Sequence, residues 1–359
     1  MSARPDPLRA FLRGEIGSGA MPGAVWWVGA PGGSVSHGAE GHAAVEPEPI
    51  PVREETPFDL ASLTKPLATA VLALMLERDR LLDLDAPLQV GFPALARSPF
   101  GDATLRDAAT HRGGFPAWIA LYLSGQRRED YVRAIAGARP GAARGTTLYS
   151  DLGYVLLGFA IERAGRATLA RQFQDRIAGP LGLSRAGFED GSGRFADAAA
   201  TERGNAYERS LAGASAAASR FREHLLRGEV HDGNAWGLGG VAGHAGLFAT
   251  AEEVAAIAFA ILEPARLGLS AGALDAMLVP GEREAGRTFG FALARDTESV
   301  RGVLPGHAVG HLGFTGTSLW IDAGQPRIYV LLTNRVHPSV GPREFAPTRR
   351  AFHALAAAL

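Results

Sequence analysis

The pattern of apolar and polar positions predicts strands near both ends of the chain and helices between them. Residues 21–30 and 34–40 have strand composition on either side of a turn-prone Pro-Gly-Gly segment. Near the other end, residues 289–295, 307–322 and 327–333 also read as strands. Helical patterns cover residues 6–18, 62–80, 131–137, 151–164, 167–177, 217–226, 250–262 and 343–359. The pattern therefore predicts an α+β fold, with one antiparallel sheet built from both chain termini and flanked by helices.

This arrangement divides the chain into a sheet domain and an insertion. We expect residues 1–80 and 249–359 to form the sheet domain, and residues 81–248 to form a largely helical domain inserted into it. Two poorly patterned stretches within the insertion, 186–205 and 212–219, read as surface loops. A length of 359 residues suits one large domain or two closely joined ones.

Composition excludes several classes of protein. Hydrophobic residues make up 47% of the chain and charged residues 20%, which is typical of a globular protein. The formal net charge is −1 and no basic block stands out, so we expect neither nucleic acid nor a membrane surface as a partner. The absence of cysteine excludes thiol catalysis, disulfides and Cys-ligated metal sites.

No secretory or membrane-spanning segment is visible, which predicts a cytoplasmic protein. The first 30 residues interrupt their apolar positions with Arg, Glu and Pro, and the richest apolar window, 67–76, is too short for a span. A periplasmic or secreted protein whose leader had been removed would read the same.

Lys65 is the single lysine among 36 basic residues; the other 35 are arginines. A GC-rich genome explains why lysine is scarce, but not why one lysine remains. Arginine replaces lysine as a surface charge, whereas its guanidinium cannot release a proton near neutral pH. Lys65 is therefore a candidate for chemistry that needs an ammonium able to exchange its proton.

Ser62 lies three residues before Lys65, at the start of a predicted helix. On a helix this spacing places both side chains on one face, and free amides at the helix start favour developing negative charge. A serine beside an amine is a known form of activated nucleophile. The simpler interpretation is an N-capping serine followed by a surface lysine, but the scarcity of lysine favours a functional pair.

Three motifs resemble those of the penicillin-binding and class C β-lactamase-like serine hydrolases. The segment 58–65 (FDLASLTK) looks like the first motif of that family, 149–154 (YSDLGY) like its Tyr-x-Asn motif, and His311-Leu312-Gly313 like its Lys/His-x-Gly strand. Segments 110–114 and 239–248 are also similar to the family. The resemblance implies a β-lactamase/transpeptidase-like fold with the active site at the junction of its two parts.

The resemblance also implies roles for individual residues. Ser62 would form an acyl-enzyme, and Tyr149 would act as base, as a phenolate or by shuttling a proton, while Lys65 stabilises its charge. The backbone amides of Ser62 and Phe314 would form the oxyanion hole. Lowering a phenol pKa from ~10 to ~7 requires about 4 kcal/mol, which a close, buried ammonium could largely supply. No cofactor is implied.

Departures from the family pattern bear on the substrate. His311 and Leu312 stand where many members have Lys and Thr, which help to bind a substrate carboxylate. Asp151 replaces the usual Asn, which would raise the pKa of Lys65 and disfavour an anionic substrate. With no such carboxylate site, we expect a carboxylesterase that acts on small esters or amides.

Other functions stay open. The alternatives are a D-alanyl-D-alanine carboxypeptidase or β-lactamase, an acyltransferase, and a catalytically silent binding module; the oligomeric state is open as well. His244 and Asn234, together with Asp151, His311 and Gly313, are expected to bind or support the substrate. We expect no metal site, because His307 and His311 lie in a strand context with no Glu between them.

Overall fold

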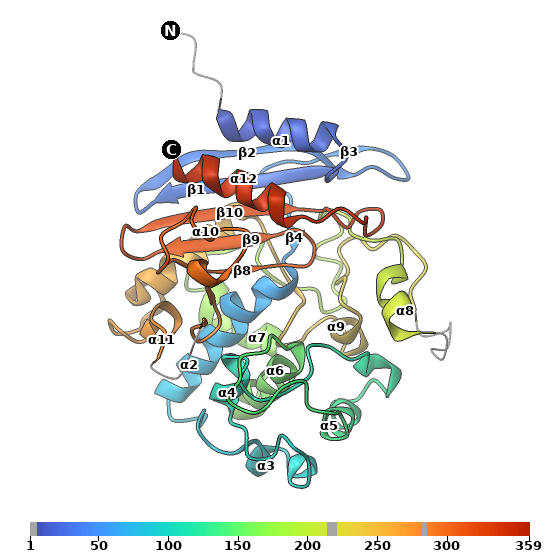
Figure 1. The fold of residues 1–359 in the computed structure, drawn as a ribbon, viewed down its shortest axis with the longest axis vertical. Helices are drawn as coiled ribbons and strands as arrows, with labels where there is room; N and C mark the ends of the chain where they lie inside the picture. The colour runs from blue at the N-terminus through green and yellow to red at the C-terminus, as the bar shows by residue number, and fades with distance from the viewer. Residues whose placement is uncertain (1–5, 214–220, 282–285) are drawn as a thin grey trace.

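The computed structural model describes residues 6–213, 221–281 and 286–359. Its main sheet has seven antiparallel strands in the order β3-β2-β1-β10-β9-β8-β7. An early strand, β1, lies beside the late strand β10, so the two ends of the chain meet in the middle of the sheet (Figure 1). This confirms the predicted α+β class. The strands are β1 (Gly23–Ala30), β2 (Gly33–Ala44), β3 (Ile50–Pro51), β7 (Ala292–Leu293), β8 (Val309–Leu312), β9 (Ser318–Asp322) and β10 (Arg327–Thr333).

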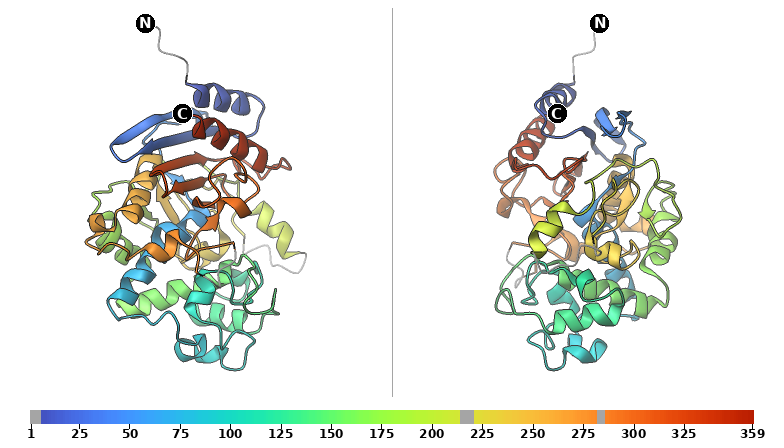
Figure 2. Two further views of the ribbon diagram at one scale, coloured as in Figure 1. Left: turned by 60° about the vertical axis from the view of Figure 1, so that its left-hand side comes forward. Right: turned by 90° about the vertical axis from the view of Figure 1, so that its right-hand side faces the viewer.

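Helices cover both faces of this sheet (Figures 1 and 2). The terminal helices α1 (Pro7–Gly17) and α12 (Ala346–Ala357) pack on one face, and α10 (Ala251–Leu262) contacts β1 and β10 on the other. Side chains alternate between the two cores, as the pleat of a strand requires. Trp26 belongs to the core beneath α1 and α12, whereas its neighbour Val25 belongs to the larger core shared with the other helices.

The remaining helices form the part of the molecule below the sheet in Figure 1. At its centre lies α2, whose residues Val71 to Leu76 are all buried, so this helix is apolar on every side. A small second sheet has the order β4-β6-β5. The strands of the second sheet are β4 (Phe58–Asp59), β5 (Gly187–Phe188) and β6 (Leu247–Ala249). The α-helices of this part are α2 (Val71–Arg78), α3 (Leu88–Gly91), α4 (Leu105–Ala109), α5 (Arg128–Ala136), α6 (Asp151–Gly165), α7 (Leu169–Phe173), α8 (Ala206–Ala212), α9 (Gly233–Gly237) and α11 (Asp275–Leu278).

Within the described ranges, none of the helices combines the length and the apolar character needed to cross a lipid bilayer. The division into a domain of residues 1–80 and 249–359 and an insertion of residues 81–248 stays a prediction.

The helical run expected over residues 62–80 is confirmed, although it starts as a 3₁₀ turn (Ala61–Leu63) and a π-helical segment (Lys65–Ala70) before α2. Two other local predictions need correction. Residues 221–226 form no helix, and 217–220 lie outside the described residues. The stretch 186–205 is not merely surface, because it contributes buried side chains, among them Phe195 and Glu202. Short apolar runs without periodicity do not show whether a segment forms a helix or a loop, or whether a loop is buried.

Leucine 76 on α2 offers a test of the central core. Leu76 is fully buried, whereas Leu81, five residues later, is 53% exposed. Removing buried methyl groups leaves a cavity, so Leu76→Ala should lower the free energy of unfolding by about 2–5 kcal/mol. Leu81→Ala should change it by no more than about 0.5 kcal/mol. Chemical denaturation monitored by circular dichroism measures both, and equal losses would contradict the central position of α2.

Candidate active site

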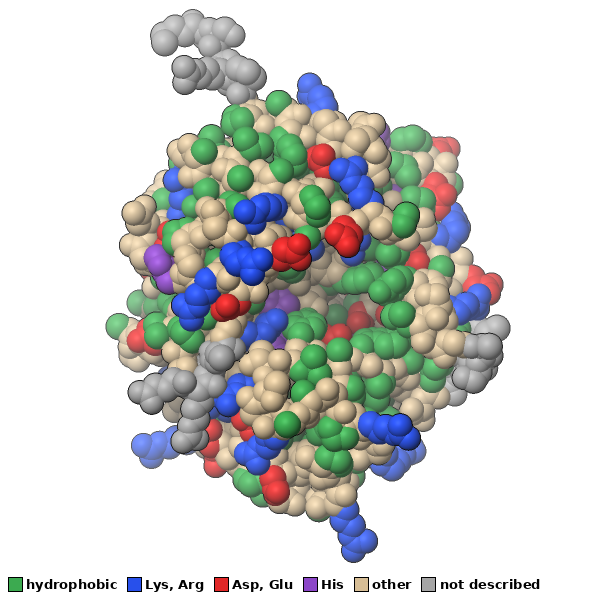
Figure 3. All heavy atoms as spheres, viewed as in Figure 1, with side chains coloured by type: hydrophobic (Ala, Val, Ile, Leu, Met, Phe, Trp, Pro, Cys, Tyr) green, Lys and Arg blue, Asp and Glu red, His purple; other side chains and the backbone are tan. Residues whose placement is uncertain are grey.

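Two cavities meet at Ser62. The face of the molecule drawn in Figure 3 is hollowed near its centre, where basic, acidic and histidine side chains lie close together. Ser62, Asp151 and Phe314 line both of them. The first, of about 410 Å³, also contains Tyr149 and Arg287 and is called the Arg287 cavity below. The second, of about 210 Å³, also contains Trp118 and is called the Trp118 cavity. The predicted nucleophile therefore lies at the boundary between two spaces that could hold the two halves of a substrate.

The turn that carries Ser62 is held by a buried carboxylate. Ala61 has a positive φ of 48°, a conformation that costs energy for any residue other than glycine. Asp59 accepts hydrogen bonds from the Ala61 amide at 2.8 Å and from the His231 amide at 2.7 Å. Burial raises the pKa of Asp59, against the lowering effect of these two amides. The side chain thus fixes the backbone just before Ser62 and ties it to the segment at His231.

The strand β8 approaches this turn closely, and only glycine fits at the contact. A Cβ atom on Gly313 would lie 1.9 Å from the Thr317 hydroxyl oxygen and 2.7 Å from the Leu60 carbonyl oxygen. The Thr317 hydroxyl donates to the same Leu60 carbonyl at 3.1 Å. Gly313 therefore supports the site through backbone packing, which brings the third motif against the first.

Lys65 is fully buried and contacts Ser62 directly. Its ammonium donates to Ser62 Oγ at 2.9 Å and to the His244 carbonyl oxygen at 3.0 Å, and lies 2.7 Å from Asp151 Oδ1. Burial opposes the charge, but the carboxylate of Asp151 and the phenol of Tyr149 outweigh it and raise the pKa of Lys65 above its ordinary value. Lys65 is a charged partner of Ser62 rather than a ready base.

Tyr149 completes the cluster from a separate segment. Its hydroxyl donates to Ser62 Oγ at 2.8 Å, and the Lys65 ammonium lies 5.1 Å from its ring centroid. The His111 ring stacks on Tyr149 with 4.6 Å between centroids, and His111 Nδ1 accepts the amide hydrogen of Ser150 at 3.1 Å. These contacts fix the start of α6 and the phenol beside it.

The pKa of Tyr149 bears on which of its two expected roles the site favours. Burial raises the pKa of Tyr149, and the lowering effect of Lys65 does not overcome it, partly because Asp151 adds a negative charge nearby. A raised pKa favours the second of the two expected roles of Tyr149, the shuttling of a proton, over a standing phenolate. The burial of the phenol, which opposes the charge of Lys65 here, cannot be predicted from the spacing of the motifs.

The amides expected to form the oxyanion hole are free to do so. Within the described part of the chain, neither the Ser62 nor the Phe314 amide donates a hydrogen bond. Phe314 follows β8 and lines both cavities with Ser62. Two unused donors beside a nucleophile suit the stabilisation of a developing oxyanion.

His311 lies in the Arg287 cavity, but it does not replace the charge of a lysine. Its Nδ1 is 2.9 Å from the Leu312 carbonyl oxygen, and its Nε2 is buried without a partner among the described residues. Burial, followed by the charges of Lys65 and Arg287, lowers the pKa of His311 well below its usual range. The ring is neutral, and since Nδ1 donates to the carbonyl, Nε2 is an acceptor.

His244 and Asn234 are not in the lining of either cavity at Ser62, and the structure places both behind the cleft, where they support it. Both are completely buried. His244 Nε2 lies 2.8 Å from Asp232 Oδ1, and the amide of Asn234 donates to the Ile119 carbonyl and accepts from the Tyr122 amide. The imidazole of His244 and the amide of Asn234 form hydrogen bonds that join loops behind the cleft. Residue type alone does not predict such bonds.

Three arginines in the lining of the Arg287 cavity were not predicted from the sequence: Arg287, Arg335 and Arg349. No motif or spacing distinguishes them from the other arginines of the chain. It also missed Glu208 in the Trp118 cavity, whose burial raises its pKa to about 7, helped by the nearby charge of Asp232.

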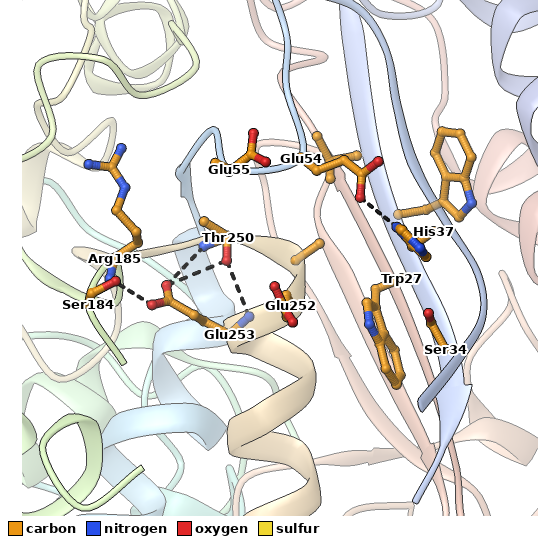
Figure 4. A pocket seen from close by; sticks show the side chains of 13 residues that line it. Trp27, Ser34, His37, Glu54, Glu55, Ser184, Arg185, Thr250, Glu252 and Glu253 are labelled. Atoms are coloured by element: carbon orange, nitrogen blue, oxygen red, sulfur yellow. Dashed lines mark hydrogen bonds and ion pairs between the residues drawn. The ribbon is translucent and has the colours of Figure 1, made fainter. Parts of the chain in front are cut away.

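A third cavity, of about 320 Å³ between β1 and the start of α10, is a weaker candidate (Figure 4). Its polar groups mainly hold structure: Glu253 accepts from the Arg185 amide at 2.6 Å and caps α10 together with Thr250. His37 pairs with Glu54 at its edge. Over the described ranges, no three His, Asp or Glu side chains gather as metal ligands would.

Comparison with known proteins agrees with this geometry. The family model described as Beta-lactamase matches residues 8–353. A protein of Escherichia coli K12, provisionally named D-alanyl-D-alanine carboxypeptidase, is 31% identical over 84% of this chain and 74% of its own length.

Solved structures match the fold over almost the whole chain. EstCE1, described as a hydrolase with promiscuous acyltransferase activity, has a TM-score of 0.74 at 18% identity and covers 98% of this chain and 97% of its own. A simvastatin synthase mutant from Aspergillus terreus has a TM-score of 0.70 at 20% identity, with 99% and 95% covered. These likenesses show the fold, and the family match over residues 8–353 shows that the chain belongs to the β-lactamase family of serine hydrolases.

Proposed function

We propose that the protein is a D,D-peptidase of the carboxypeptidase type, which acts through an acyl-Ser62 intermediate. The observation that carries the chemistry is that Ser62 Oγ lies within 2.9 Å of the Lys65 ammonium and 2.8 Å of the Tyr149 hydroxyl. The substrate class rests on the relatives at about 30% identity, which are provisionally named D-alanyl-D-alanine carboxypeptidases. These relatives favour this alternative over the carboxylesterase that we first expected.

In the first half of the reaction, Ser62 Oγ attacks the carbonyl carbon of the substrate. The proton of Ser62 passes to the Tyr149–Lys65 pair, and the carbonyl oxygen takes up negative charge near the Ser62 and Phe314 amides. When the tetrahedral intermediate collapses, the bond to the leaving nitrogen breaks and that nitrogen receives the proton. The acyl group is now an ester of Ser62.

In the second half, water attacks the ester and Ser62 is regenerated. The attacking water gives its proton to the Tyr149–Lys65 pair, and Ser62 Oγ recovers one as the ester bond breaks. Since the pKa values of both Tyr149 and Lys65 are raised, the resting pair holds all its protons. The reactive form is the pair after the loss of one proton, and the two groups titrate as a unit.

A carboxylesterase is the second candidate, because the Trp118 cavity has a largely apolar wall. Trp118, Leu211, Ala245 and Phe314 all contribute to it. Such a wall suits an uncharged acyl chain as well as a peptide.

Turnover of matched substrates separates these functions. We expect release of D-alanine from N-acetyl-D-alanyl-D-alanine, and much slower release of L-alanine from the isomer that ends in an L-residue. Rapid hydrolysis of p-nitrophenyl butyrate without any release of D-alanine would favour the esterase, and rapid turnover of nitrocefin a β-lactamase. No burst with any of these substrates would favour a silent binding module.

Substitution of the nucleophile and of the phenol tests the acyl-enzyme chemistry. Ser62→Ala should abolish the mass increase that a fluorophosphonate produces on the parent protein. Tyr149→Phe should lower kcat/KM by about 10²–10⁴-fold, the usual contribution of a positioned acid–base group. Tyr329→Phe, which removes a hydroxyl from the core beneath α1 and α12, serves as control and should leave kcat/KM near that of the parent. Equal effects of the two tyrosine substitutions would exclude Tyr149 from the chemistry.

The pH profile tests the protonation of the resting site. Since the base must lose a proton and its pKa is raised, kcat/KM should increase with pH on the alkaline side of neutrality. Asp151 raises the pKa values of both Lys65 and Tyr149. Asp151→Asn should therefore move the rising limb to lower pH.

Asp102→Asn is the matched control for this measurement, because the Asp102 carboxylate is exposed and lines neither cavity at Ser62. It should leave the limb in place. If Asp151→Asn moved the rising limb of kcat/KM to higher pH, or left it in place, the Lys65–Tyr149 pair would not be the titrating group.

A further inference from the structure

His231 lies against the residue that is expected to supply half of the oxyanion hole. Its side chain is buried, with 4% of the residue exposed, and it lines the Trp118 cavity. The imidazole stacks on the Phe314 ring, with 5.5 Å between the centroids and 26° between the planes. Phe314 carries one of the two amides that, in the described part of the chain, donate no hydrogen bond. A contact that holds the Phe314 ring therefore also restrains this amide.

A buried carboxylate holds His231 in this position. Glu202 is 1% exposed, and its Oε2 lies 3.0 Å from His231 Nε2. Its other oxygen, Oε1, accepts the amide hydrogen of Tyr207 at 3.0 Å. The Tyr207 ring in turn contacts the Phe314 ring, with 5.0 Å between centroids. Glu202 thus ties together the two residues whose rings contact Phe314.

The pair of His231 and Glu202 carries charge inside the protein. Burial would lower the pKa of His231, but the hydrogen bond with Glu202 and the nearby charges of Glu208 and Asp59 outweigh it and raise this pKa. A charged imidazole donates a charge-assisted hydrogen bond to the carboxylate. A buried ion pair is often no more stabilising than packed apolar residues of the same volume. Its presence behind Phe314 therefore fits a role in fixing geometry.

The backbone of His231 is tied to the other half of the oxyanion hole. The His231 amide donates to Asp59 Oδ2 at 2.7 Å, and Asp59 Oδ1 accepts from the Ala61 amide at 2.8 Å. Ala61 directly precedes Ser62, whose amide is the second free donor. One path of contacts therefore leads from His231 to Ser62, and another leads from its ring to Phe314.

His231 is not placed to exchange a proton in the reaction. Its Nε2 is occupied by Glu202, whereas Ser62 Oγ contacts Lys65 and Tyr149. What remains for His231 is to act through the residues that it contacts.

We propose that His231 is a positioning residue of the oxyanion hole, which sets the separation of the Ser62 and Phe314 amides through its backbone amide and its ring. The inference rests on the acyl-Ser62 chemistry of the proposed function and goes beyond it. Negative charge develops on the substrate oxygen only in the transition state, so misplaced amides lower the rate rather than the affinity for substrate.

The rate at which a fluorophosphonate labels Ser62 tests this role, because the phosphoryl oxygen also gains negative charge as Ser62 attacks. His231→Gln keeps the backbone amide and a side-chain donor for Glu202, but it has no ring to stack on Phe314. Labelling, followed by intact mass, should become about 10–100-fold slower, the scale expected for a misplaced catalytic group. Labelling at the parent rate would overturn the proposal.

His307→Gln is the matched control. His307 also pairs with a carboxylate, Asp322 at 2.9 Å, but its side chain is 61% exposed and it lines neither cavity at Ser62. Its labelling rate should stay within about twofold of the parent rate.

A double-mutant cycle separates positioning through Phe314 from a general loss of structure. Phe314→Ala keeps the amide but removes the ring on which His231 acts. In this background His231→Gln should slow labelling by less than about threefold, because coupled residues do not have additive effects. The same factor with and without the Phe314 ring would show that His231 does not act through Phe314.

A second variant covers the case in which His231→Gln does not fold, which a circular dichroism melt of each variant detects. Glu202→Gln keeps an acceptor for the Tyr207 amide but removes the charge that holds the His231 ring. It should slow labelling several-fold, and a parent rate for a folded Glu202→Gln would overturn the proposal.

The kinetics of peptide turnover give an independent measurement. With N-acetyl-D-alanyl-D-alanine, His231→Gln should lower kcat by about 10–100-fold and leave KM within about twofold, because the lost stabilisation belongs to the transition state. A raised KM at unchanged kcat would place His231 in substrate binding instead and overturn the proposal.

The two proposals fail in different ways. If labelling depends on His231 and on the Phe314 ring, but the parent releases no D-alanine, the D,D-peptidase is overturned and the positioning role stands. Release of D-alanine by the parent, with labelling that does not depend on His231, would do the reverse. No labelling of the parent at all would overturn both.

Discussion

The buried ammonium of Lys65 is the constraint around which the site is assembled. A charge removed from water is tolerated only where opposite charge and hydrogen-bond acceptors surround it. Lys65 obtains them from three separate segments: Ser62 in the preceding turn, Asp151 at the start of α6, and the carbonyl of His244. Removing any one segment would leave the ammonium undercompensated. The same contacts that stabilise the charge therefore bring the first and second motifs together and hold Ser62 between them.

The nucleophile is held in a strained turn, and the surrounding fold keeps it there. Ala61 adopts a left-handed conformation that an isolated chain would leave. Asp59 restrains it from one side, and the close approach of β8 at Gly313 restrains it from the other. Because β8 belongs to the sheet and α6 to the helical part, Ser62 depends on the correct packing of both. A site of this kind does not form on a local segment of sequence.

Residues that are rare or belong to a recognisable motif could be predicted as site residues from the sequence. Residues whose role depends on their position in the fold could not. Lys65 stood out because no other lysine exists, and Tyr149 because its motif has a recognisable order relative to Ser62. Arg287 is one of the chain's 35 arginines and lies in a stretch without periodicity. Only the structure reveals that it lines the cavity and that its buried Nη1 has no partner among the described residues. The sequence also could not show that the amide of Asn234 joins two loops behind the cleft, because this depends on which groups surround it. The pKa of Tyr149 likewise depends on burial, which spacing does not measure.

The charge that lines the cleft changes sign across Ser62, which would give a charged substrate a direction. On one side lie Arg287 and a neutral His311; on the other lie Asp232 and Glu208, with the pKa of Glu208 raised to about 7. A carboxylate on the acyl half would meet like charge, whereas the same carboxylate on the leaving half would meet the guanidinium. Like charges at close range cost more free energy than the loss of a favourable contact, so this asymmetry would disfavour the reversed orientation as well as favour the productive one. Tyr149 lines the same cavity as Arg287, so in the proposed reaction the charge of the cleft and the position of the proton donor favour the same orientation.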